Sequence, residues 1–276
     1  MNRRVLGIYR EPEFSPGKVE ADAAILDSVL AELAGEGFET VTMDAESFAA
    51  GAAARADLIL AMCQGRTALW RLAEAERSSV LSINSALGIR NCYRDLMASG
   101  LAHARVPIPA GGLVATSEKL DTCKLPGVDF NAGVFVKRGD LHALGPGDVR
   151  RADDRAEVAA ILAHFARNAV PLAYVQQEVI GRVVKFYGVS GGGYFTALSD
   201  GEEISDTIIR SLAKAASDAA AALGLEAWGG DAIVSDESFA IIDFNDWPSY
   251  SRVRAPAARA IARRAIALLW RRYSRA

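Results

Sequence analysis

The order of apolar runs along residues 1–90 is the feature that most constrains the fold. Runs of strand length lie at residues 3–9, 38–43, 56–63 and 79–84. Between the first two runs, apolar residues recur with the spacing of a helix face over residues 25–33. Strands that alternate with helices are typical of a parallel sheet covered by helices. We therefore expect a parallel α/β layer at the start of the chain.

The pattern changes after Pro107 and Pro109, which end a helix. We expect strands at residues 111–116, 133–139 and 171–179, a hairpin over 182–199 that turns at Gly191–Gly193, and two strands within 229–245. We expect helices at 155–168, 204–223 and 255–276. The sequence thus predicts an α/β (α+β) fold in three domains, at residues 1–106, 107–179 and 180–276.

Composition narrows the functional class. The chain has 276 residues, of which 51% are hydrophobic, as in a globular protein with substantial buried cores. The formal net charge of −3 creates no overall field that favours nucleic acid or acidic membranes. The three cysteines include no CxxC pair, so neither a disulfide framework nor a zinc site is indicated. Without a signal-peptide or membrane-span pattern, we expect a cytoplasmic protein with no nucleic-acid or membrane partner.

The segment AIIDFNDWPSY, residues 240–250, raises the question of a metal site. Alternation along a strand places Asp243 and Asn245 on one face and Phe244 on the other. Asp231 starts the preceding strand after a Gly-Gly pair. If the two strands are antiparallel neighbours, the three oxygen-bearing side chains converge, and such a ligand set suits Mg²⁺. The alternative is an ordinary strand end, because Asp and Asn also commonly start turns.

Two lysines lie inside apolar runs, Lys137 in GVFVKRG and Lys185 in GRVVKFYGV. Charges fixed on rigid strands suit nucleotide phosphates. Each lysine alone also fits a strand edge, with its amine reaching water.

A glycine-rich loop, RGDLHALGPGDVRR at residues 138–151, lies between the two lysines and contains Arg138, His142, Arg150 and Arg151. Such loops can close over phosphates through backbone N–H groups, although no GxxxxGK[ST] pattern is present. A solvated surface hairpin is the alternative. Beyond it, residues 174–181 (YVQQEVIG) form either an edge strand or an interdomain crossing that holds a nucleotide.

In this order the segments resemble the ATP-grasp superfamily. The family pattern is a strand lysine, a glycine-rich loop, a Q-E-V-I hinge, a second strand lysine, an Asp preceded by Gly, and Asp-x-Asn-x-x-Pro. Residues 83–109 are also similar to the family's link into its central domain, so the resemblance extends from about residue 80 onward. It implies an ATP-grasp architecture, with an N-terminal parallel α/β layer followed by two α+β subdomains that clamp ATP.

The resemblance also implies ligands for ATP and Mg²⁺. The implied ATP contacts are Lys137 and Lys185 at the phosphates and Gln177, Glu178 and Val179 at the adenosine, and the implied Mg²⁺ ligands are Asp231, Asp243 and Asn245. The sequence departs from the family by having Asp at both acidic metal positions, where many members have Glu.

Within the superfamily, residues 177–189 and 241–250 are most similar to the inositol 1,3,4-trisphosphate 5/6-kinase-like branch. This implies transfer of the γ-phosphoryl group to a small anionic acceptor such as a phosphorylated polyol. Lys185 and Arg252 would act catalytically, and the acceptor would be bound by Arg138, His142, Arg252 and Arg254.

Two other functions remain open from the sequence. Most ATP-grasp enzymes are carboxylate–amine ligases that act through an acyl phosphate, and their carboxylate substrate also needs arginine. A non-catalytic nucleotide-binding module is the third interpretation. The arginines themselves also fit a solvated surface, paired with the abundant Asp and Glu residues.

Overall fold

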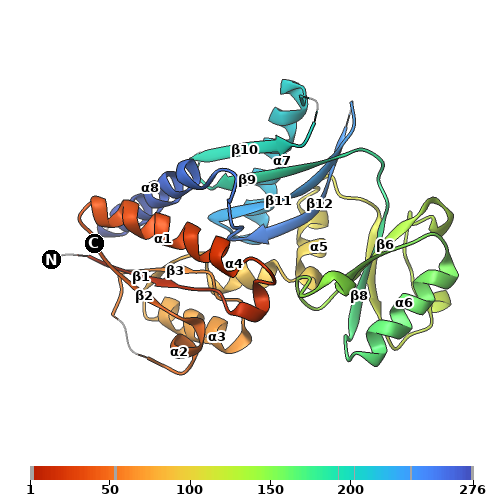
Figure 1. Cartoon of the computed structure of the whole chain (residues 1–276), viewed down its shortest axis with the longest axis horizontal. Coiled ribbons are helices and arrows are strands. Elements are labelled where there is room, and N and C mark those ends of the chain that lie inside the picture. The colour runs from red at the N-terminus through yellow and green to blue at the C-terminus, as the bar shows by residue number, and fades with distance from the viewer. Residues whose placement is uncertain (1–2, 53–54, 192, 202, 237, 275–276) are drawn as a thin grey trace.

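The structure, a computed structural model, describes residues 3–52, 55–191, 193–201, 203–236 and 238–274. Within them the chain forms three four-stranded sheets that follow one another along the sequence (Figure 1). We call them the N-terminal, central and C-terminal sheets.

The N-terminal sheet is parallel, as predicted, with the strand order β2-β1-β3-β4. Its strands are β1 (Arg4–Ile8), β2 (Glu39–Met43), β3 (Leu58–Ala61) and β4 (Leu81–Ile83). Helices α1 (Val19–Gly35) and α8 (Arg254–Tyr273) cover one face, and α2 (Ala45–Ala49) and α3 (Arg66–Arg77) cover the other. Because successive strand residues point to opposite faces, Val5 packs in the first layer, whereas Leu6 and Ile8 pack in the second.

The helix predicted before Pro107 is α5 (Arg94–His103). A separate short helix, α4 (Ala86–Asn91), precedes it, because Tyr93 between them has an extended backbone with φ −63° and ψ 136°.

The central sheet is antiparallel, with the order β5-β8-β6-β7. Its strands are β5 (Gly111–Ala115), β6 (Val134–Arg138), β7 (Val149–Ala152) and β8 (Leu172–Gln177). Helix α6 (Arg155–Arg167) packs on it through Val158, Leu162 and Phe165. The glycine-rich loop connects β6 to β7, so it extends from one edge of this sheet.

The C-terminal sheet is also antiparallel, with the order β10-β9-β11-β12. Its strands are β9 (Arg182–Val189), β10 (Tyr194–Ser199), β11 (Ala227–Val234) and β12 (Phe239–Asp246). Strands β9 and β10 form the predicted hairpin, although Gly192 in its turn lies outside the described residues. Helix α7 (Asp206–Leu223) covers one face; the Ser205 hydroxyl caps its start and the left-handed Gly224 ends it.

Among the described residues, four short 3-10 helices lie in the connections: Pro12–Phe14, Leu120–Thr122, Phe130–Ala132 and Pro146–Asp148. The first follows β1 and the last belongs to the glycine-rich loop, so two of them lie in segments that approach the site described below.

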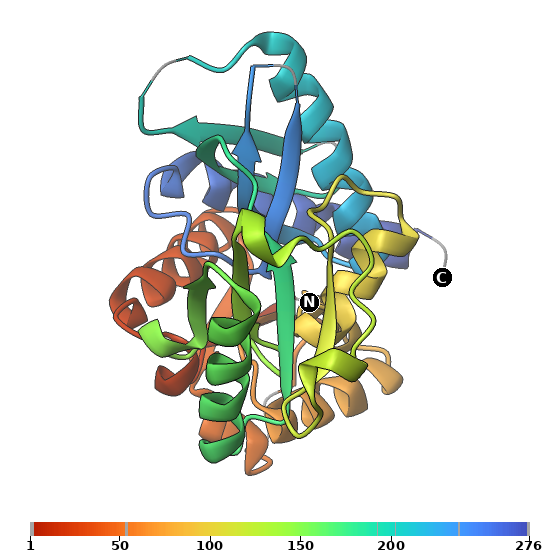
Figure 2. The ribbon, with the colours of Figure 1, turned by 90° about the vertical axis from the view of Figure 1, so that its right-hand side faces the viewer.

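The N-terminal and C-terminal sheets share one core. Tyr187, Val189 and Ala227 of the C-terminal sheet lie in the same buried cluster as Val5 and Leu58 of the N-terminal sheet. We call these two sheets with their helices the main body, and the central sheet with α6 the central unit. The central unit stands to one side of the main body in Figure 1 and faces the viewer in Figure 2.

The predicted α/β (α+β) class, with a parallel α/β layer followed by two α+β subdomains, is therefore confirmed, and both later sheets are antiparallel. The domain boundaries stay predictions, and α8 packs beside α1 on the N-terminal sheet despite its distance in sequence.

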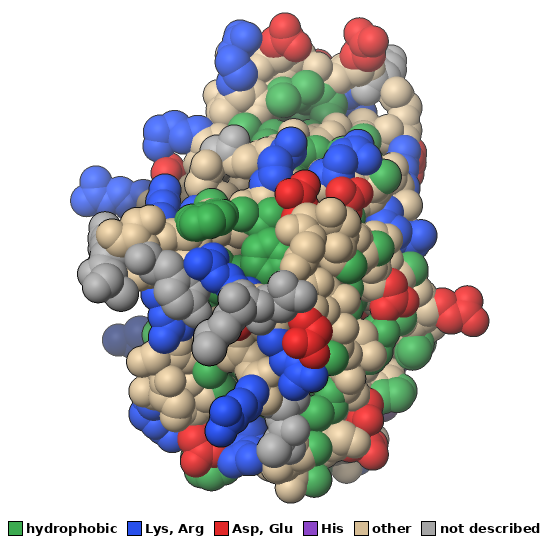
Figure 3. Space-filling view, turned by 90° about the vertical axis from the view of Figure 1, so that its left-hand side faces the viewer, with side chains coloured by type: hydrophobic (Ala, Val, Ile, Leu, Met, Phe, Trp, Pro, Cys, Tyr) green, Lys and Arg blue, Asp and Glu red, His purple; other side chains and the backbone are tan. Residues whose placement is uncertain are grey.

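Two surface properties complete the description. None of the described helices is long and apolar enough to cross a membrane. On the face near the two chain termini, basic and acidic side chains occur together (Figure 3).

Candidate functional site

A pocket of about 280 Å³ opens where the three sheets approach one another. Residues after β1 line one side, and β9, β11 and the end of β12 line another. His142 and Ala143 of the glycine-rich loop line a third. The charged residues of the lining are Arg10, Lys18, Asp22, Lys185, Asp231, Asp243 and Asp246.

The three predicted metal ligands converge at this pocket. Strands β11 and β12 are antiparallel neighbours, as predicted, with Asp231 opposite Asp243 and Gly229 opposite Asn245. All three side chains line the pocket, whereas Phe244 is fully buried on the other face of the sheet. The predicted alternation along β12 is thus confirmed.

The start of β11 differs from the prediction. Asp231 lies inside β11 and does not start it, because the strand begins at Ala227 and includes Gly229 and Gly230. A Cβ atom on Gly230 would lie 2.3 Å from the carbonyl oxygen of Asp243. The Gly-Gly pair therefore lies inside the strand and allows a close approach of its neighbours.

Lys137 contacts β12 at a bulge. The register of β11 and β12 shifts after Asp231, so that Ile242 has no register partner in β11. The carbonyl oxygen of Ile242 accepts a hydrogen bond of 2.9 Å from Lys137 Nζ of the central unit. Lys137 is only 6% exposed, and burial lowers the pKa of its ammonium to about 8.

Asp243 is surrounded by basic side chains. Burial acts to raise the pKa of its carboxyl group, but Arg94, Lys137 and His142 outweigh this effect, so the pKa lies below its usual value. Arg94, at the start of α5, is 3.6 Å from Asp243 and donates a hydrogen bond of 2.7 Å to the carbonyl oxygen of Arg138. It was not predicted, because nothing in the sequence distinguishes a buried arginine in the first turn of a helix.

Lys185 and Asp231 form an ion pair of 2.9 Å between β9 and β11. Burial acts to lower the pKa of Lys185, and the hydrogen bond and charge of Asp231 reverse that effect and raise it. The second predicted phosphate lysine is therefore held on the pocket wall by a predicted metal ligand.

The predicted hinge joins β8 of the central sheet to β9 of the C-terminal sheet. Gln177 is fixed by its side chain, which accepts from the Asp129 N–H group and donates to the Gly133 carbonyl oxygen, both at 2.7 Å. Glu178 forms an ion pair of 2.8 Å with Arg151 of β7. Val179 follows directly, in the crossing between the two sheets. The adenosine contacts proposed for these residues stay predictions.

The predicted acceptor residues are not assembled into one cluster. His142 lines the pocket, whereas Arg138, Arg252 and Arg254 lie outside its lining. Arg138 pairs with Asp140 at 2.7 Å, and Arg252 pairs with Asp200 at 2.6 Å.

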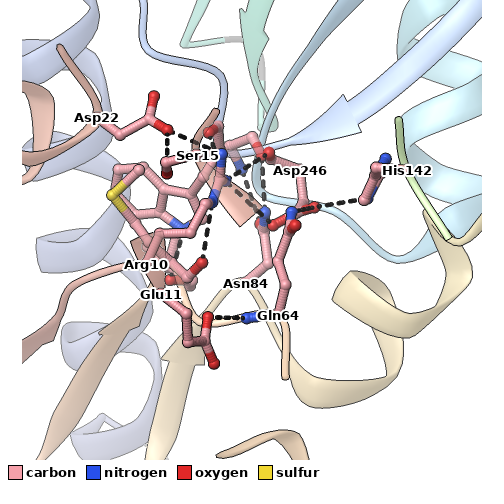
Figure 4. A network of polar contacts seen from close by, with 12 residues as sticks. Arg10, Glu11, Ser15, Asp22, Gln64, Asn84, His142 and Asp246 are labelled. Carbon is pink, nitrogen blue, oxygen red and sulfur yellow. Dashed lines mark hydrogen bonds and ion pairs between the residues drawn. The ribbon is translucent and has the colours of Figure 1, made fainter. Parts of the chain in front are cut away.

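A second polar network on the N-terminal side was missed by sequence reasoning (Figure 4). It contains Arg10 and Glu11 after β1, Gln64 after β3, and Asp246 at the end of β12. Because ligand sites in parallel sheets lie at the carboxyl ends of the strands, the polar residues after β1 and β3 could have been singled out from the sequence.

No protein-family model matches the sequence, and a search of curated proteins finds no match. Solved structures do match over almost the whole chain. D-alanine–D-alanine ligase from Bacillus anthracis, complexed with ATP, has a TM-score of 0.74 at 12% identity, covering 98% of this chain and 99% of that chain. VanG D-Ala:D-Ser ligase from Enterococcus faecalis has a TM-score of 0.73 at 11% identity, covering 98% and 100%. D-alanine–D-alanine ligase from Coxiella burnetii has a TM-score of 0.72 at 12% identity, covering 99% and 98%.

These similarities show the fold: the chain has the ATP-grasp architecture that the sequence motifs implied. They give no support to the narrower resemblance to inositol phosphate kinases.

Proposed function

We propose that the chain is an ATP-grasp ligase that activates a small carboxylate with ATP and joins it to an amine. The ligase structures named above share its fold over almost its whole length, which supports this function. Of the functions considered from the sequence, this one takes precedence over the inositol phosphate kinase.

The observation that carries the proposal is the charge of the pocket. Its described lining has three cationic side chains against four carboxylates. Arg10 and Lys185 are themselves paired with Asp22 and Asp231. A phosphorylated polyol needs a surplus of arginine and lysine, with several charge-assisted bonds to each phosphate. A small carboxylate or a zwitterion is a better match to a lining whose charges are nearly balanced.

ATP as the substrate would lie between the central and C-terminal sheets. We assign the phosphates to Lys137 and Lys185 and the adenosine to Gln177, Glu178 and Val179, at the crossing from β8 to β9. Lys137 and Lys185 already lie on either side of Asp243 and Asp231, where they are bonded to Ile242 and Asp231. The phosphates would take over these lysine contacts.

The donor set at this edge fits Mg²⁺ bound together with phosphates. Asp231, Asp243 and Asn245 offer only hard oxygen ligands from adjacent strands. Among the described residues, no cluster of three or more His, Cys, Asp or Glu side chains could hold a metal by itself. Mg²⁺ is commonly held by one or two carboxylates and completed by substrate oxygens, which agrees with such a sparse set. The ion would supply charge neutralisation at the transferred phosphoryl group.

The reaction requires two bond exchanges in one closed site. A carboxylate oxygen of the first substrate attacks the γ-phosphorus and ADP leaves; the amine then attacks the acyl carbon and phosphate leaves. The glycine-rich loop, which brings His142 and Ala143 to the pocket, is placed to exclude water from the acyl phosphate.

The test is trapping of the acyl phosphate. The protein is incubated with ATP, Mg²⁺, hydroxylamine and a panel of small carboxylic acids that includes D- and L-amino acids. We expect a hydroxamate to form with at least one acid and to depend on ATP. The Lys137→Ala variant is expected to need more ATP for the same rate.

Each other outcome identifies a different function. Transfer of labelled γ-phosphate to an inositol phosphate as a stable ester, without hydroxamate, would show a kinase. Tight ATP binding with no hydroxamate and no phosphoryl transfer would show a non-catalytic nucleotide-binding module.

A further inference from the structure

Asp246 is a pocket carboxylate of the C-terminal sheet that side chains approach both from the N-terminal sheet and from the glycine-rich loop of the central unit. It ends β12 and its side chain is 0% exposed. One oxygen, Oδ1, accepts a hydrogen bond of 2.9 Å from Gln64 Nε2 of the N-terminal sheet. His142 Nε2 of the glycine-rich loop lies 3.7 Å from the same oxygen (Figure 4).

The second oxygen of Asp246 has no hydrogen-bond donor. The nearest cation is Arg10, whose Nη2 lies 3.8 Å away, beyond hydrogen-bond distance. Arg10 is committed elsewhere: it pairs with Asp22 at 3.3 Å and donates to the carbonyl oxygens of Met62, Asp246 and Trp247. A buried carboxylate with an unsatisfied oxygen is costly, so a further donor is expected to approach it.

His142 faces this carboxylate at Oδ1, and a carboxylate oxygen can accept a second hydrogen bond beside the one from Gln64. His142 Nε2 is also buried without a hydrogen-bond partner, and its ring lies edge-on to Tyr93 at a centroid distance of 6.2 Å. The glycine-rich loop that carries it contains Gly145 and Gly147, around which there is open space. A movement of about 1 Å would bring the imidazole into hydrogen-bond distance of the carboxylate.

The carboxylate itself is held still. Gln64, its hydrogen-bond donor, is fixed at the start of α3, where the buried Glu11 accepts from the backbone N–H groups of Gln64 and Gly65, each at 2.9 Å. Arg10 fixes the backbone of Asp246 and Trp247. Asp246 is thus a rigidly held hydrogen-bond acceptor on the main body, and it faces the glycine-rich loop of the central unit.

We propose that Asp246 is a positioning residue, which holds His142 at the N-terminal side of the pocket when the glycine-rich loop closes. His142 then contacts the acceptor, and Asp246 determines where the imidazole lies. The proposal rests on the ligase function for the identity of the acceptor, but the contact between His142 and Asp246 does not.

The first experiment is a double-mutant cycle with His142→Ala, Asp246→Asn and the double variant. Asparagine keeps the oxygen that accepts from Gln64 and removes the negative charge that faces His142. We expect each single variant to lower kcat/KM for the acceptor by about ten-fold or more, with KM for ATP changed by less than about two-fold. The kcat/KM of the double variant should be no lower than that of the less active single variant, because the two substitutions remove the same contact.

The matched control is His164→Ala. His164 lies on α6 of the same central unit, and its ring nitrogen faces Asn168 at 3.4 Å. This variant should behave as the wild type in every assay. Losses that add in the double variant, or a rise in KM for ATP alone, would overturn the positioning role.

The second experiment does not need turnover. Amide hydrogen exchange of residues 139–147 is compared in the wild type, Asp246→Asn, His142→Ala and His164→Ala. We expect faster exchange in the first two variants and no change in the control, since the loop has lost its anchor on the main body. Unchanged exchange in Asp246→Asn would refute the contact, whether or not the chain proves to be a ligase.

Discussion

Asp243 is the residue whose substitution tests the site most directly. It faces Asp231 across the β11–β12 pair, and Arg94 lies 3.6 Å from its carboxylate. We expect Asp243→Asn to reduce hydroxamate formation by more than about 100-fold, because it removes one of the two carboxylates proposed as ligands of Mg²⁺. The variant should still fold, since asparagine has the same shape; circular dichroism and the thermal midpoint check this. Hydroxamate formation at the wild-type rate would show that Asp243 binds no ion.

Lys137 gives a prediction about stability and pH in the absence of ATP and Mg²⁺. Its pKa is about 8 in the folded chain against a reference of 10.5, because burial disfavours the ammonium. Between these two pH values the unfolded chain therefore binds more protons than the folded one, and the free energy of unfolding rises with pH. The destabilisation caused by burying the Lys137 ammonium is complete below pH 8 and is lost above pH 10.5.

The measurement is urea unfolding of the wild type and Lys137→Met from pH 7 to pH 10.5. The wild type should gain up to about 3 kcal/mol relative to the variant across this range. A difference that stays constant with pH would mean that Lys137 titrates normally in the folded protein.

At this scale the sequence indicates some residues and conceals others. Asp243 and Asn245 could be predicted because period-two alternation places them on one face of a strand. Asp246 and Arg94 could not, because a buried charge is identified only by the partners that surround it. Arg252 and Arg254 were predicted at the site because they follow β12 closely in sequence, yet they lie outside the pocket lining.

At the scale of elements, the turn after β12 is held by both the N-terminal and the C-terminal sheet. Trp247 and Tyr250 have positive φ angles of 38° and 48°, which most residues avoid. Both are fully buried. The Trp247 indole donates a hydrogen bond of 2.9 Å to the carbonyl oxygen of Ile83. The Tyr250 hydroxyl donates one of 3.0 Å to the carbonyl oxygen of Gly188. The turn is therefore rigid, and it fixes where the last pocket residues of β12 lie.

Asn84 ties the end of β4 to the start of β11. Its fully buried side chain donates to the carbonyl oxygen of Ala227 at 2.7 Å and accepts from the N–H groups of Glu226 and Ala227. We expect Asn84→Ala to lower the free energy of unfolding by about 2–4 kcal/mol, because it leaves several buried backbone groups unsatisfied. Urea unfolding measures this.

The matched control for Asn84 is Asn91→Ala. Asn91 makes one described side-chain bond, to the carbonyl oxygen of Leu223 at 3.0 Å, and is only partly buried. Its replacement should cost less than about 1 kcal/mol. Equal losses in the two variants would mean that the Asn84 contacts do not hold the sheets together.

Most elements were predictable because each has a local signal. The helix expected at 204–223 is α7, whose start at Asp206 is set by the Ser205 cap. The start of β11 was not predictable, since only the close approach of the adjoining strands explains why Gly229 and Gly230 lie inside the strand.

At the scale of the whole molecule, the shared core predicts which parts move. The N-terminal and C-terminal sheets pack in one cluster, whereas the central unit has its own core and touches the main body through contacts such as Lys137 with Ile242. We expect ATP with Mg²⁺ to draw the central unit toward the main body.

Paired labels measure this movement. In a Cys123→Ser background, one pair of cysteines at positions 163 and 211 spans the two bodies, and a control pair at 34 and 211 lies within the main body. The distance across the first pair should shorten with ATP and the second should not. Equal changes, or none in the first pair, would contradict the division into two bodies.

The arrangement of the three sheets was not predictable from the residues alone. Strand and helix patterns give the order of elements, but the packing of α8 beside α1 depends on surfaces that lie far apart in the sequence. The acceptor could not be predicted for the same reason, because the pocket lining combines residues from both ends of the chain and from the middle.

The position of α8 has a consequence for how the protein is made. Ala257, Ile261 and Leu269 belong to the same core as Val5 and Ile25. On the ribosome, the first sheet therefore emerges long before the helix that covers one of its faces. Contacts of such separation form slowly, and the apolar face stays open to other chains in the interval. We expect nascent chains to depend on chaperones until α8 has been synthesised.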